Sequence, residues 1–406
     1  MGLLLVAIVV ALVARRLRLP YTVGLVLTGM LLAVSRVELG GHLTHDFIFD
    51  VVLPPLLFEA ALNISWRELR RDLVPVLVLA IVGTVGAAAT VTAGLVLALG
   101  WPIQPALLFG ALIAATDPVA VIAMFKDNGV EGRLRLLVEA ESLFNDGVAA
   151  VLFVLAFAWV ETGAASTGLP FHDILWTLAV AVLGGTVCGL VCASATIVLA
   201  GRTTDHLVES TLTTVAAYGS FLLADRLHGS GVLATVAAGL VIGNFRPLKR
   251  NGQVWLSQRG REFILALWEF VAFLANSLVF LLIGSAVATL SFDQLQYREI
   301  AIILVLVLLS RAATVYPLSL VFSWSRWAIG IVDQHILWWG GLRGALALAL
   351  ALSLPSELPY HDTILIATFA VVAFSILVQG LTMPLMLAWG SRRQAREHPQ
   401  GDAPTP

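Results

Sequence analysis

The sequence has 406 residues, of which 59% are hydrophobic and 12% are charged, and its formal net charge is −2. Soluble domains carry about 25% charged residues, so this composition excludes an ordinary soluble protein. The small net charge gives no indication of a nucleic-acid partner, and none is expected. Repeated apolar runs of about 20 residues indicate membrane-spanning helices and not the shorter alternating strands of an outer-membrane barrel.

Thirteen apolar segments follow one another along the chain, and each is expected to form a membrane helix. They span residues 2–14, 21–34, 46–64, 73–99, 103–125, 133–159, 173–200, 207–227, 230–244, 262–287, 299–323, 335–353 and 362–389. The first segment is short, but its positive charge follows the apolar stretch, so it is interpreted as a helix and not as a signal peptide. Residues 391–406 are predicted to form a short disordered cytoplasmic tail.

Basic residues fall mostly on alternate loops between these segments. Examples are the arginines after the first and third segments, at positions 15, 16, 18, 67, 70 and 71, and those of the tail at 392, 393 and 396. The remaining loops hold only Arg36, Arg226 and Arg298. Cytoplasmic loops carry the excess of Lys and Arg, so the N-terminus is expected outside a plasma membrane and the C-terminus in the cytoplasm.

The two cysteines, Cys188 and Cys192, lie one helical turn apart inside an apolar run. They are expected to pack as small hydrophobic side chains, and neither a disulfide framework nor a zinc site is predicted. The histidines lie mostly in loops or at segment ends and have no metal-ligand spacing. No resident cofactor is therefore expected.

Two of the predicted helices are interrupted. Pro118, within Ala115-Thr116-Asp117-Pro118, has no N–H and clashes with the carbonyl four residues earlier, so the backbone should unwind there. The second interruption is the glycine-rich stretch Gly340-Gly341-Leu342-Arg343-Gly344. One interrupted helix in each half of the chain indicates a secondary transporter built from inverted repeats, with its site near the middle of the membrane. Two unrelated kinks are the alternative.

Ionisable side chains also lie inside the apolar segments, where each costs roughly 2.5–3.5 kcal/mol on insertion scales. Ser142 and Asp146 share one helix face at i,i+4, as do Glu141 and Asn145 on the adjacent face. Because burial favours the protonated carboxyl and a bound cation favours the ionised one, a single carboxylate could carry either a proton or a cation. For Glu141, a buried ion pair with Arg311 or Arg343 is the favoured alternative. The full set is Glu59, Asp117, Glu141, Asp146, Glu269, Arg311 and Arg343, with Thr116, Ser142, Asn145 and Asn276 as neutral members.

Several motifs together resemble those of the cation:proton antiporter-1 family, in its NhaP-like bacterial and archaeal branch. They are Thr116-Asp117-Pro118-Val119-Ala120-Val121, Glu141-Ser142-Leu143-Phe144-Asn145-Asp146-Gly147, Gly340-Gly341-Leu342-Arg343-Gly344-Ala345, Pro54-Pro55-Leu56-Leu57-Phe58-Glu59 and Trp268-Glu269-Phe270. The resemblance covers nearly the whole chain.

The resemblance implies an all-α polytopic membrane protein with about thirteen transmembrane helices, NhaA-like inverted repeats and two broken crossing helices. It further implies a homodimer that exchanges Na⁺ or Li⁺ for H⁺. Its implied parts are dimerisation-domain helices 1–3 in residues 1–71, core helices 4–6 in 72–160, linker helix 7 and dimerisation-domain helices 8–10 in 161–290, core helices 11–13 in 291–390 and the tail.

The resemblance also assigns roles to the intramembrane residues. Asp146 would exchange a proton for the cation, and the implied cation ligands are Asp146, Ser142, Glu59, Thr116 and Asn145. Asp117 would act through water or hold the unwound crossing. Glu141 would pair with Arg311 as a structural bridge, and Arg343 would stabilise the second broken helix.

Electrogenic relatives carry Asp-Asp where this sequence has Asn145-Asp146, so the resemblance implies electroneutral exchange of one cation for one proton. Side-chain types do not separate Na⁺ from K⁺, and a K⁺/H⁺ or broad monovalent cation exchanger is the alternative. A channel and an intramembrane aspartyl protease using Asp117 and Asp146 are remote alternatives. The protease would need a Gly-x-Gly-Asp pattern, which the sequence lacks, so an enzyme is not expected.

Overall fold

The computed structural model describes residues 2–17, 20–35, 43–161, 171–203, 205–245, 258–289 and 295–397. Over these ranges the chain forms helices joined by turns, and no strand is present among them, so the predicted all-α class is confirmed. Seven helical segments of this part are long and apolar enough to cross a membrane: Trp66–Leu99, Arg133–Glu161, Leu175–Ala200, His206–Arg226, Gly260–Ala288, Tyr297–Val321 and His361–Gly390. The count of thirteen crossings stays a prediction, because the other apolar helices are shorter.

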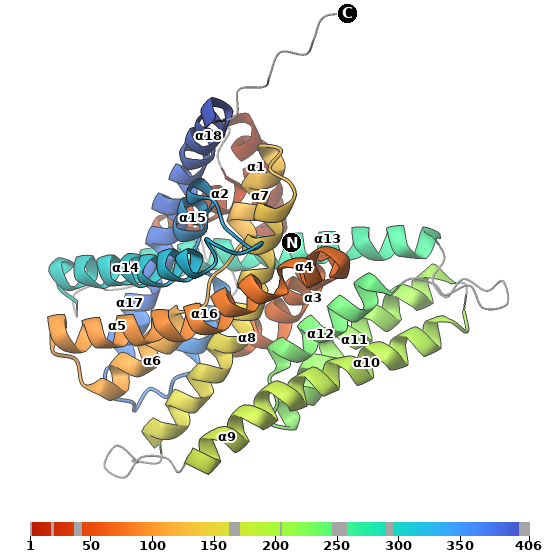
Figure 1. Cartoon of the computed structure of the whole chain (residues 1–406), viewed down its shortest axis with the longest axis horizontal. Coiled ribbons are helices and arrows are strands. Elements are labelled where there is room, and N and C mark those ends of the chain that lie inside the picture. Colours follow the sequence, from red (N-terminus) through yellow and green to blue (C-terminus); the bar gives the residue numbers. More distant parts are fainter. Residues whose placement is uncertain are drawn as a thin grey trace, which may run out of the picture.

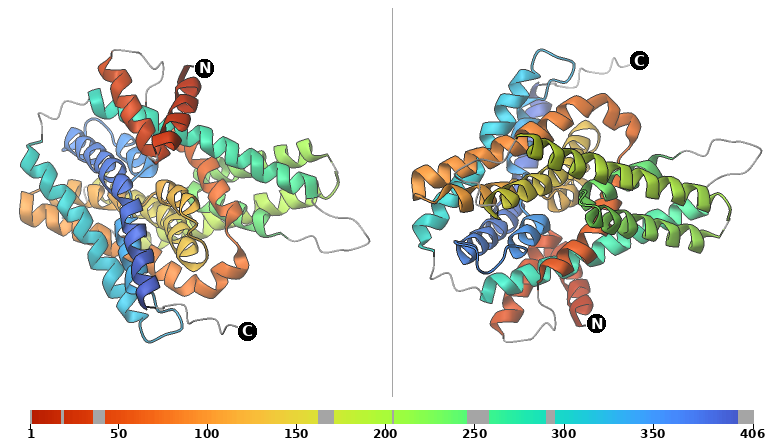
Figure 2. Two further views of the ribbon diagram at one scale, coloured as in Figure 1. Left: turned by 90° about the horizontal axis from the view of Figure 1, so that it is seen from above. Right: turned by 90° about the horizontal axis from the view of Figure 1, so that it is seen from below.

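One group of helices includes α10, α11, α12 and α13, which extend to one side of the molecule (Figures 1 and 2). In it, α13 packs along α2, and α12 packs against α3, α10 and α11. The group comprises α1 (Gly2–Leu17), α2 (Tyr21–Val34), η1 (Phe47–Val52), α3 (Leu53–Asn63), α9 (Phe171–Ala179), η3 (Val180–Gly184), α10 (Gly185–Ala200), α11 (His206–Arg226), α12 (Gly231–Asn244) and α13 (Gln258–Thr289).

A second group contains both interrupted helices. Here α5 packs against α6 and α14, and α16 packs against α6 and α17. Its elements are α4 (Trp66–Val78), η2 (Leu79–Gly83), α5 (Thr84–Leu99), α6 (Ile103–Ile113), α7 (Val119–Asp127), α14 (Tyr297–Val321), α15 (Ile331–Trp339), α16 (Ala345–Leu352), α17 (His361–Phe374), η5 (Ser375–Gln379) and α18 (Gly380–Glu397). The elements labelled η are π-helical turns within longer helices.

Helix α8 (Arg133–Glu161) lies between the two groups. It packs against α4 and α6 of the second group and against α3 and α12 of the first. Gly147 faces Leu233 of α12 so closely that a Cβ at Gly147 would overlap with the leucine side chain. The stretch Glu141–Gly147 is therefore placed at the contact between the two groups, and it is not a helix end at the membrane surface.

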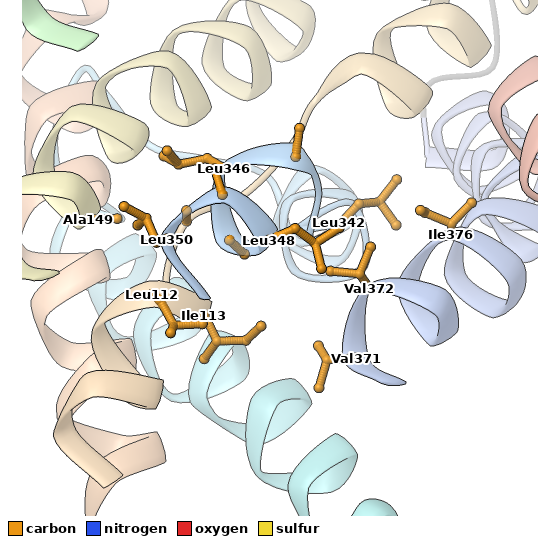
Figure 3. Close-up of a cluster of buried hydrophobic side chains, with 14 of the residues drawn as sticks. Leu112, Ile113, Ala149, Leu342, Leu346, Leu348, Leu350, Val371, Val372 and Ile376 are labelled. Carbon is orange, nitrogen blue, oxygen red and sulfur yellow. The ribbon is translucent and has the colours of Figure 1, made fainter. Parts of the chain in front are cut away.

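An apolar core surrounds the second interruption and fixes its position (Figure 3). Leu346, Leu348 and Leu350 of α16 are buried, and they pack in one cluster with side chains of α6 and α17. Within a membrane, helices associate through close van der Waals packing and not through removal of apolar surface from water, so these contacts hold the short α16, which has only eight residues, against its neighbours.

One predicted boundary is wrong. The fourth segment, predicted from 73, follows a kink at Asp72, whose backbone (φ −111°, ψ 17°) is not helical. Before this kink lies a further, strongly amphipathic helical stretch at 66–71, which the search for apolar runs did not predict, because a polar stretch at a membrane surface can be helical without being apolar. The last helix continues to Glu397, beyond the predicted start of a disordered tail at 391, because residues 391–397 are mostly good helix formers. Residues 398–406 lie outside the described residues.

Candidate functional site

The first interruption separates α6 from α7 at residues 114–118. The helix ends because Pro118 lacks an N–H, and it restarts directly after this proline. Asp117 Oδ1 accepts a hydrogen bond of 2.9 Å from the N–H of Val119, which satisfies one of the free donors at the start of α7. The predicted break in the first half of the chain is therefore confirmed.

The second interruption separates α15 from α16 at residues 340–344, and the two breaks meet. The N–H of Asp117 donates a 2.8 Å hydrogen bond to the carbonyl of Leu342, which joins the two unwound segments directly. At the same place, a Cβ added to Gly344 would overlap with the Asp117 carboxylate. The second break is thus confirmed, and the glycine at 344 is what permits the close approach.

We expect Gly344→Ala to lower the melting temperature of the purified protein in detergent. Overpacking of this kind costs about 1–3 kcal/mol, since the Asp117 side chain, which accepts the hydrogen bond from Val119, has to move. Gly83→Ala is the matched control, because its Cβ would lie 3.8 Å from Leu318 Cδ1, an ordinary contact. Equal melting temperatures of the two variants would contradict the contact at Gly344.

Arg343 has a different role from the one implied by the resemblance. Its Nη1 donates to the carbonyls of Ala114 and Ala115, at 2.9 and 2.8 Å, and no ion pair of Arg343 occurs among the described residues. These carbonyls are left free where α6 ends, and a cation is favourable at a helix C-terminus. Arg343 therefore stabilises the first broken helix from its position on the second, and it does not share the ion pair of Glu141.

Two residues that the sequence analysis missed hold the second break. Ser375 Oγ accepts from the N–H of Arg343 at 3.1 Å, and Gln379 Nε2 donates to the carbonyl of Trp339 at 3.0 Å. Both belong to the π-helical turn η5, one turn apart. They satisfy backbone groups that unwinding would otherwise leave without a partner. Two polar residues within an otherwise apolar segment were the signal that could have identified them.

Glu141 and Arg311 form a buried, bidentate ion pair. Arg311 Nη1 donates to Glu141 Oε1 and Arg311 Nη2 to Glu141 Oε2, each at 2.8 Å. The side chains are 2% and 8% exposed, respectively. Arg311 Nη2 also donates to the carbonyl of Leu337, the residue two positions before the end of α15. The pair therefore ties α8 and α14 to the second broken helix.

A neutral hydrogen-bonded cluster lies beside this pair. Ser142 Oγ donates to the Thr116 carbonyl, and Thr116 Oγ1 donates to Ser142 Oγ at 3.2 Å. Asn145 Nδ2 donates to Thr116 Oγ1 at 3.1 Å and to Glu141 Oε1 at 3.4 Å. Asn145 Oδ1 is a buried acceptor without a protein partner in the described ranges. The cluster links α8 to the first break.

Asp146 faces a cavity of about 60 Å³ at the crossing of the broken helices. A water needs about 10–15 Å³ measured in this way, so the cavity has room for a small cation with water. Thr116 and Asp117 of the first break, and Gly344 of the second, also line it. Among the described residues the Asp146 carboxylate has neither a hydrogen bond nor an ion pair. It is thus available to a ligand.

The other predicted residues lie elsewhere. Ser142 lines a smaller cavity of about 10 Å³ beside Arg311 and Glu141. Glu59 does not line the Asp146 cavity, and its Oε1 accepts a 2.7 Å hydrogen bond from Asn63. Glu269 lies at the surface of the bundle, where it is 69% exposed and pairs with Lys126, within the apolar segment Gly260–Ala288.

Glu139 was missed by the sequence analysis, although it lines the same cavity as Asp146. It lies seven residues before Asp146, two turns away on the same face of α8. That spacing was the signal that could have found it. Because Glu139 lies close in sequence to Arg133 and Arg135, it resembled a solvent-exposed charged residue at the end of a helix.

Two interrupted helices that cross at buried polar groups, inside a bundle of apolar helices, define a secondary transporter. A family model described as "Sodium/hydrogen exchanger, transmembrane" matches residues 3–389. The chain belongs to this family, whose members are transporters, and the resemblance found in the sequence is confirmed.

Individual relatives agree with this assignment. The Na⁺/H⁺ antiporter ApNhaP of Aphanothece halophytica is 39% identical over 393 residues, which are 94% of this chain and 72% of that protein. The Na⁺/H⁺ antiporter NhaP of Pseudomonas aeruginosa is 35% identical and covers 91% of each chain. The solved structure of the sodium proton antiporter MjNhaP1 from Methanocaldococcus jannaschii has a TM-score of 0.73 at 20% identity, over 95% of this chain and 97% of that one. This last match shows the same fold.

Proposed function

We propose that this protein exchanges Na⁺, or Li⁺, for H⁺ across the membrane. The observation that carries the proposal is the Asp146 carboxylate, which lines a cavity at the crossing of two broken helices and has no protein partner among the described residues. The names of the relatives support the choice of ions, since ApNhaP and NhaP are both called Na⁺/H⁺ antiporters. No chemical conversion of a substrate and no resident cofactor are part of the proposal.

The exchange follows from competition for one carboxylate. In a cavity of low polarity, an empty Asp146 would carry a proton, and a cation that binds its oxygens would displace this proton. If the site opens to one side of the membrane at a time, each cation moves in exchange for a proton. Asn145 supports a ratio of one to one, because its amide carries no exchangeable charge and its NH₂ is used by Thr116 and Glu141.

Oxygen atoms around the cavity supply the proposed cation site. Hard cations prefer carboxylate, carbonyl and water oxygens, and Asp146 with the Thr116 backbone carbonyl would provide two of them. Asp117 would hold the crossing through its bonds to Val119 and Leu342, and reach the cation through water. Ser142, Glu59 and Asn145 stay predicted ligands, of which Ser142 orients the Thr116 carbonyl.

The wider arrangement is also proposed. The distribution of basic residues supports a plasma-membrane protein with its N-terminus outside and its C-terminus in the cytoplasm. The two packing groups support a division into dimerisation-domain helices 1–3 and 8–10 and core helices 4–6 and 11–13, with α9 and α10 as the linker. The exposed apolar side chains of α1, such as Leu5 and Leu12, would contact lipid or a second copy in a homodimer.

Exchange by the purified protein in proteoliposomes tests this function. A pH gradient is imposed, and its collapse by Na⁺, Li⁺ and K⁺ is measured separately, with the membrane potential clamped at zero or at a negative value. We expect Na⁺ and Li⁺, but not K⁺, to collapse the gradient, at a rate that does not depend on the potential.

Each other outcome changes one part of the proposal. An equal response to K⁺ would make the protein a broad monovalent cation/H⁺ exchanger. Dependence on the potential would contradict the ratio of one to one and mean that a second carboxylate titrates in each cycle. No collapse by any cation, with the protein shown to be folded by its melting transition, would contradict the function itself.

A further inference from the structure

The cavity that contains Asp146 is lined by a further acidic side chain, Glu139, besides that of Asp117. Glu139 lines it together with Leu143 and Asp146 of α8, and with Leu56 and Ala60 of α3. Glu139 and Asp146 are seven residues apart, so they are separated by roughly 10 Å along the helix axis and point into the same space. Glu139 lies on the side of the basic residues Arg133 and Arg135, which is the proposed cytoplasmic side.

The contacts of Glu139 differ from those of Glu141, although only two residues separate them. Glu141 is held by two hydrogen bonds of 2.8 Å from a buried arginine. Glu139 has a single contact of 3.7 Å with Arg135, and these side chains are 13% and 35% exposed. A partly exposed i,i+4 pair is weak and can exchange partners, whereas a buried bidentate pair does not. Glu139 is therefore free to receive a cation.

The charge in the cavity favours cations. Within the described part of the chain, its charged lining side chains are Asp117, Glu139 and Asp146, and every other lining side chain is uncharged. A cleft with carboxylates of one sign and apolar walls concentrates ions of the opposite sign. Glu59, which the resemblance implies as a ligand, is outside this lining and accepts a hydrogen bond from Asn63.

We propose that Glu139 is a further cation-binding residue, which collects the cation at the proposed cytoplasmic mouth of the cavity and delivers it to Asp146. Arg135 competes with the cation for Glu139 and so sets how readily the mouth is occupied. This inference rests on the proposed function, because it assigns the path by which the ion reaches the exchanging carboxylate.

The test is the dependence of exchange on Na⁺ concentration, measured from the side of the membrane that carries the basic loops. For Glu139→Gln we expect the half-saturating Na⁺ concentration to rise about three- to tenfold at low ionic strength, while the maximal rate stays within about twofold of wild type. The rise should shrink in a high concentration of a non-transported salt, because salt screens an exposed charge. Glu139→Asp should restore most of the affinity.

Further variants separate this role from its alternatives. Arg135→Gln should lower the half-saturating concentration, since it frees Glu139, and a merely structural pair would not produce that gain. Glu131→Gln, which changes an exposed carboxylate outside the cavity lining, is the matched control and should change the concentration less than twofold. Glu59→Gln tests the neighbouring carboxylate that the resemblance implies as a ligand.

If the half-saturating Na⁺ concentration of Glu139→Gln equals that of a wild-type protein that exchanges Na⁺ for H⁺, this inference is overturned and the proposed function is left intact. A larger rise for Glu59→Gln than for Glu139→Gln would transfer the role to Glu59. Absence of exchange in the wild type would instead overturn the proposed function, and this inference with it.

Discussion

Asparagine in place of Asp146 is expected to abolish cation/proton exchange while leaving the protein folded. The amide has a similar shape but neither carries a negative charge nor releases a proton, so competition between the two ions ends. Because the Asp146 carboxylate has no protein partner in the described ranges, the change removes no contact on which the fold depends. Exchange is measured in proteoliposomes, and we expect the variant to show no more exchange than protein-free vesicles. Folding is measured by the melting temperature, which should equal or exceed that of the wild-type protein.

Asp146→Glu provides the matched comparison. The longer side chain keeps the charge and the proton but moves the oxygens within a cavity of about 60 Å³. We therefore expect weak exchange with a changed half-saturating cation concentration. Retention of wild-type exchange by Asp146→Asn would place the exchanging group elsewhere, and Asp117 would then be the next residue to replace.

Replacement of Glu141 by glutamine is expected to have the largest effect on stability. It leaves the Arg311 guanidinium, which is 8% exposed, without a counter-charge. Removal of one partner from a buried pair costs about 3–5 kcal/mol, because the remaining charge stays out of water. The measurement is the melting temperature and folded yield of the variant in detergent, and both should fall sharply.

Glu139→Gln is the control for this prediction, because it makes the same chemical change two residues away in a weak pair. Its stability should change by less than about 1 kcal/mol. Combining Glu141→Gln with Arg311→Met should recover part of the loss, since no charge is then left buried. If Glu141→Gln melts like wild type, the pair has no structural role.

Much of the fold could be predicted from the sequence because apolar runs and helix-breaking residues act locally. Most of the segment boundaries lie within a few residues of the helices, and Pro118 marked the first break correctly. The prediction failed where helical stretches are polar, at 66–71 before the kink at Asp72 and after Gly390, since a search for apolar runs excludes such residues.

The site could be predicted only in part, because the packing of the helices determines which side chains that are distant in the sequence contact each other. The residue types left Arg311 and Arg343 both open as partners of Glu141, and only the resemblance to a family selected Arg311, which the structure confirms. Neither source indicated that Arg343 reaches the carbonyls at 114 and 115. The position of Glu139 at the cavity depends on how α3 and the two breaks are placed around α8. No pattern along one helix contains that information.

The bridge between Glu141 and Arg311 also has a consequence for how the chain is made. The partners are 170 residues apart, and at synthesis rates of 5–20 residues per second the arginine is added roughly 10–30 s after the glutamate. During this interval α8 is complete, but the guanidinium that neutralises its buried carboxylate does not yet exist. The nascent protein therefore has to keep Glu141 in contact with water or another polar group until α14 arrives. A ribosome that stalls in this interval would leave behind a product with an unmatched charge at the centre of the bundle.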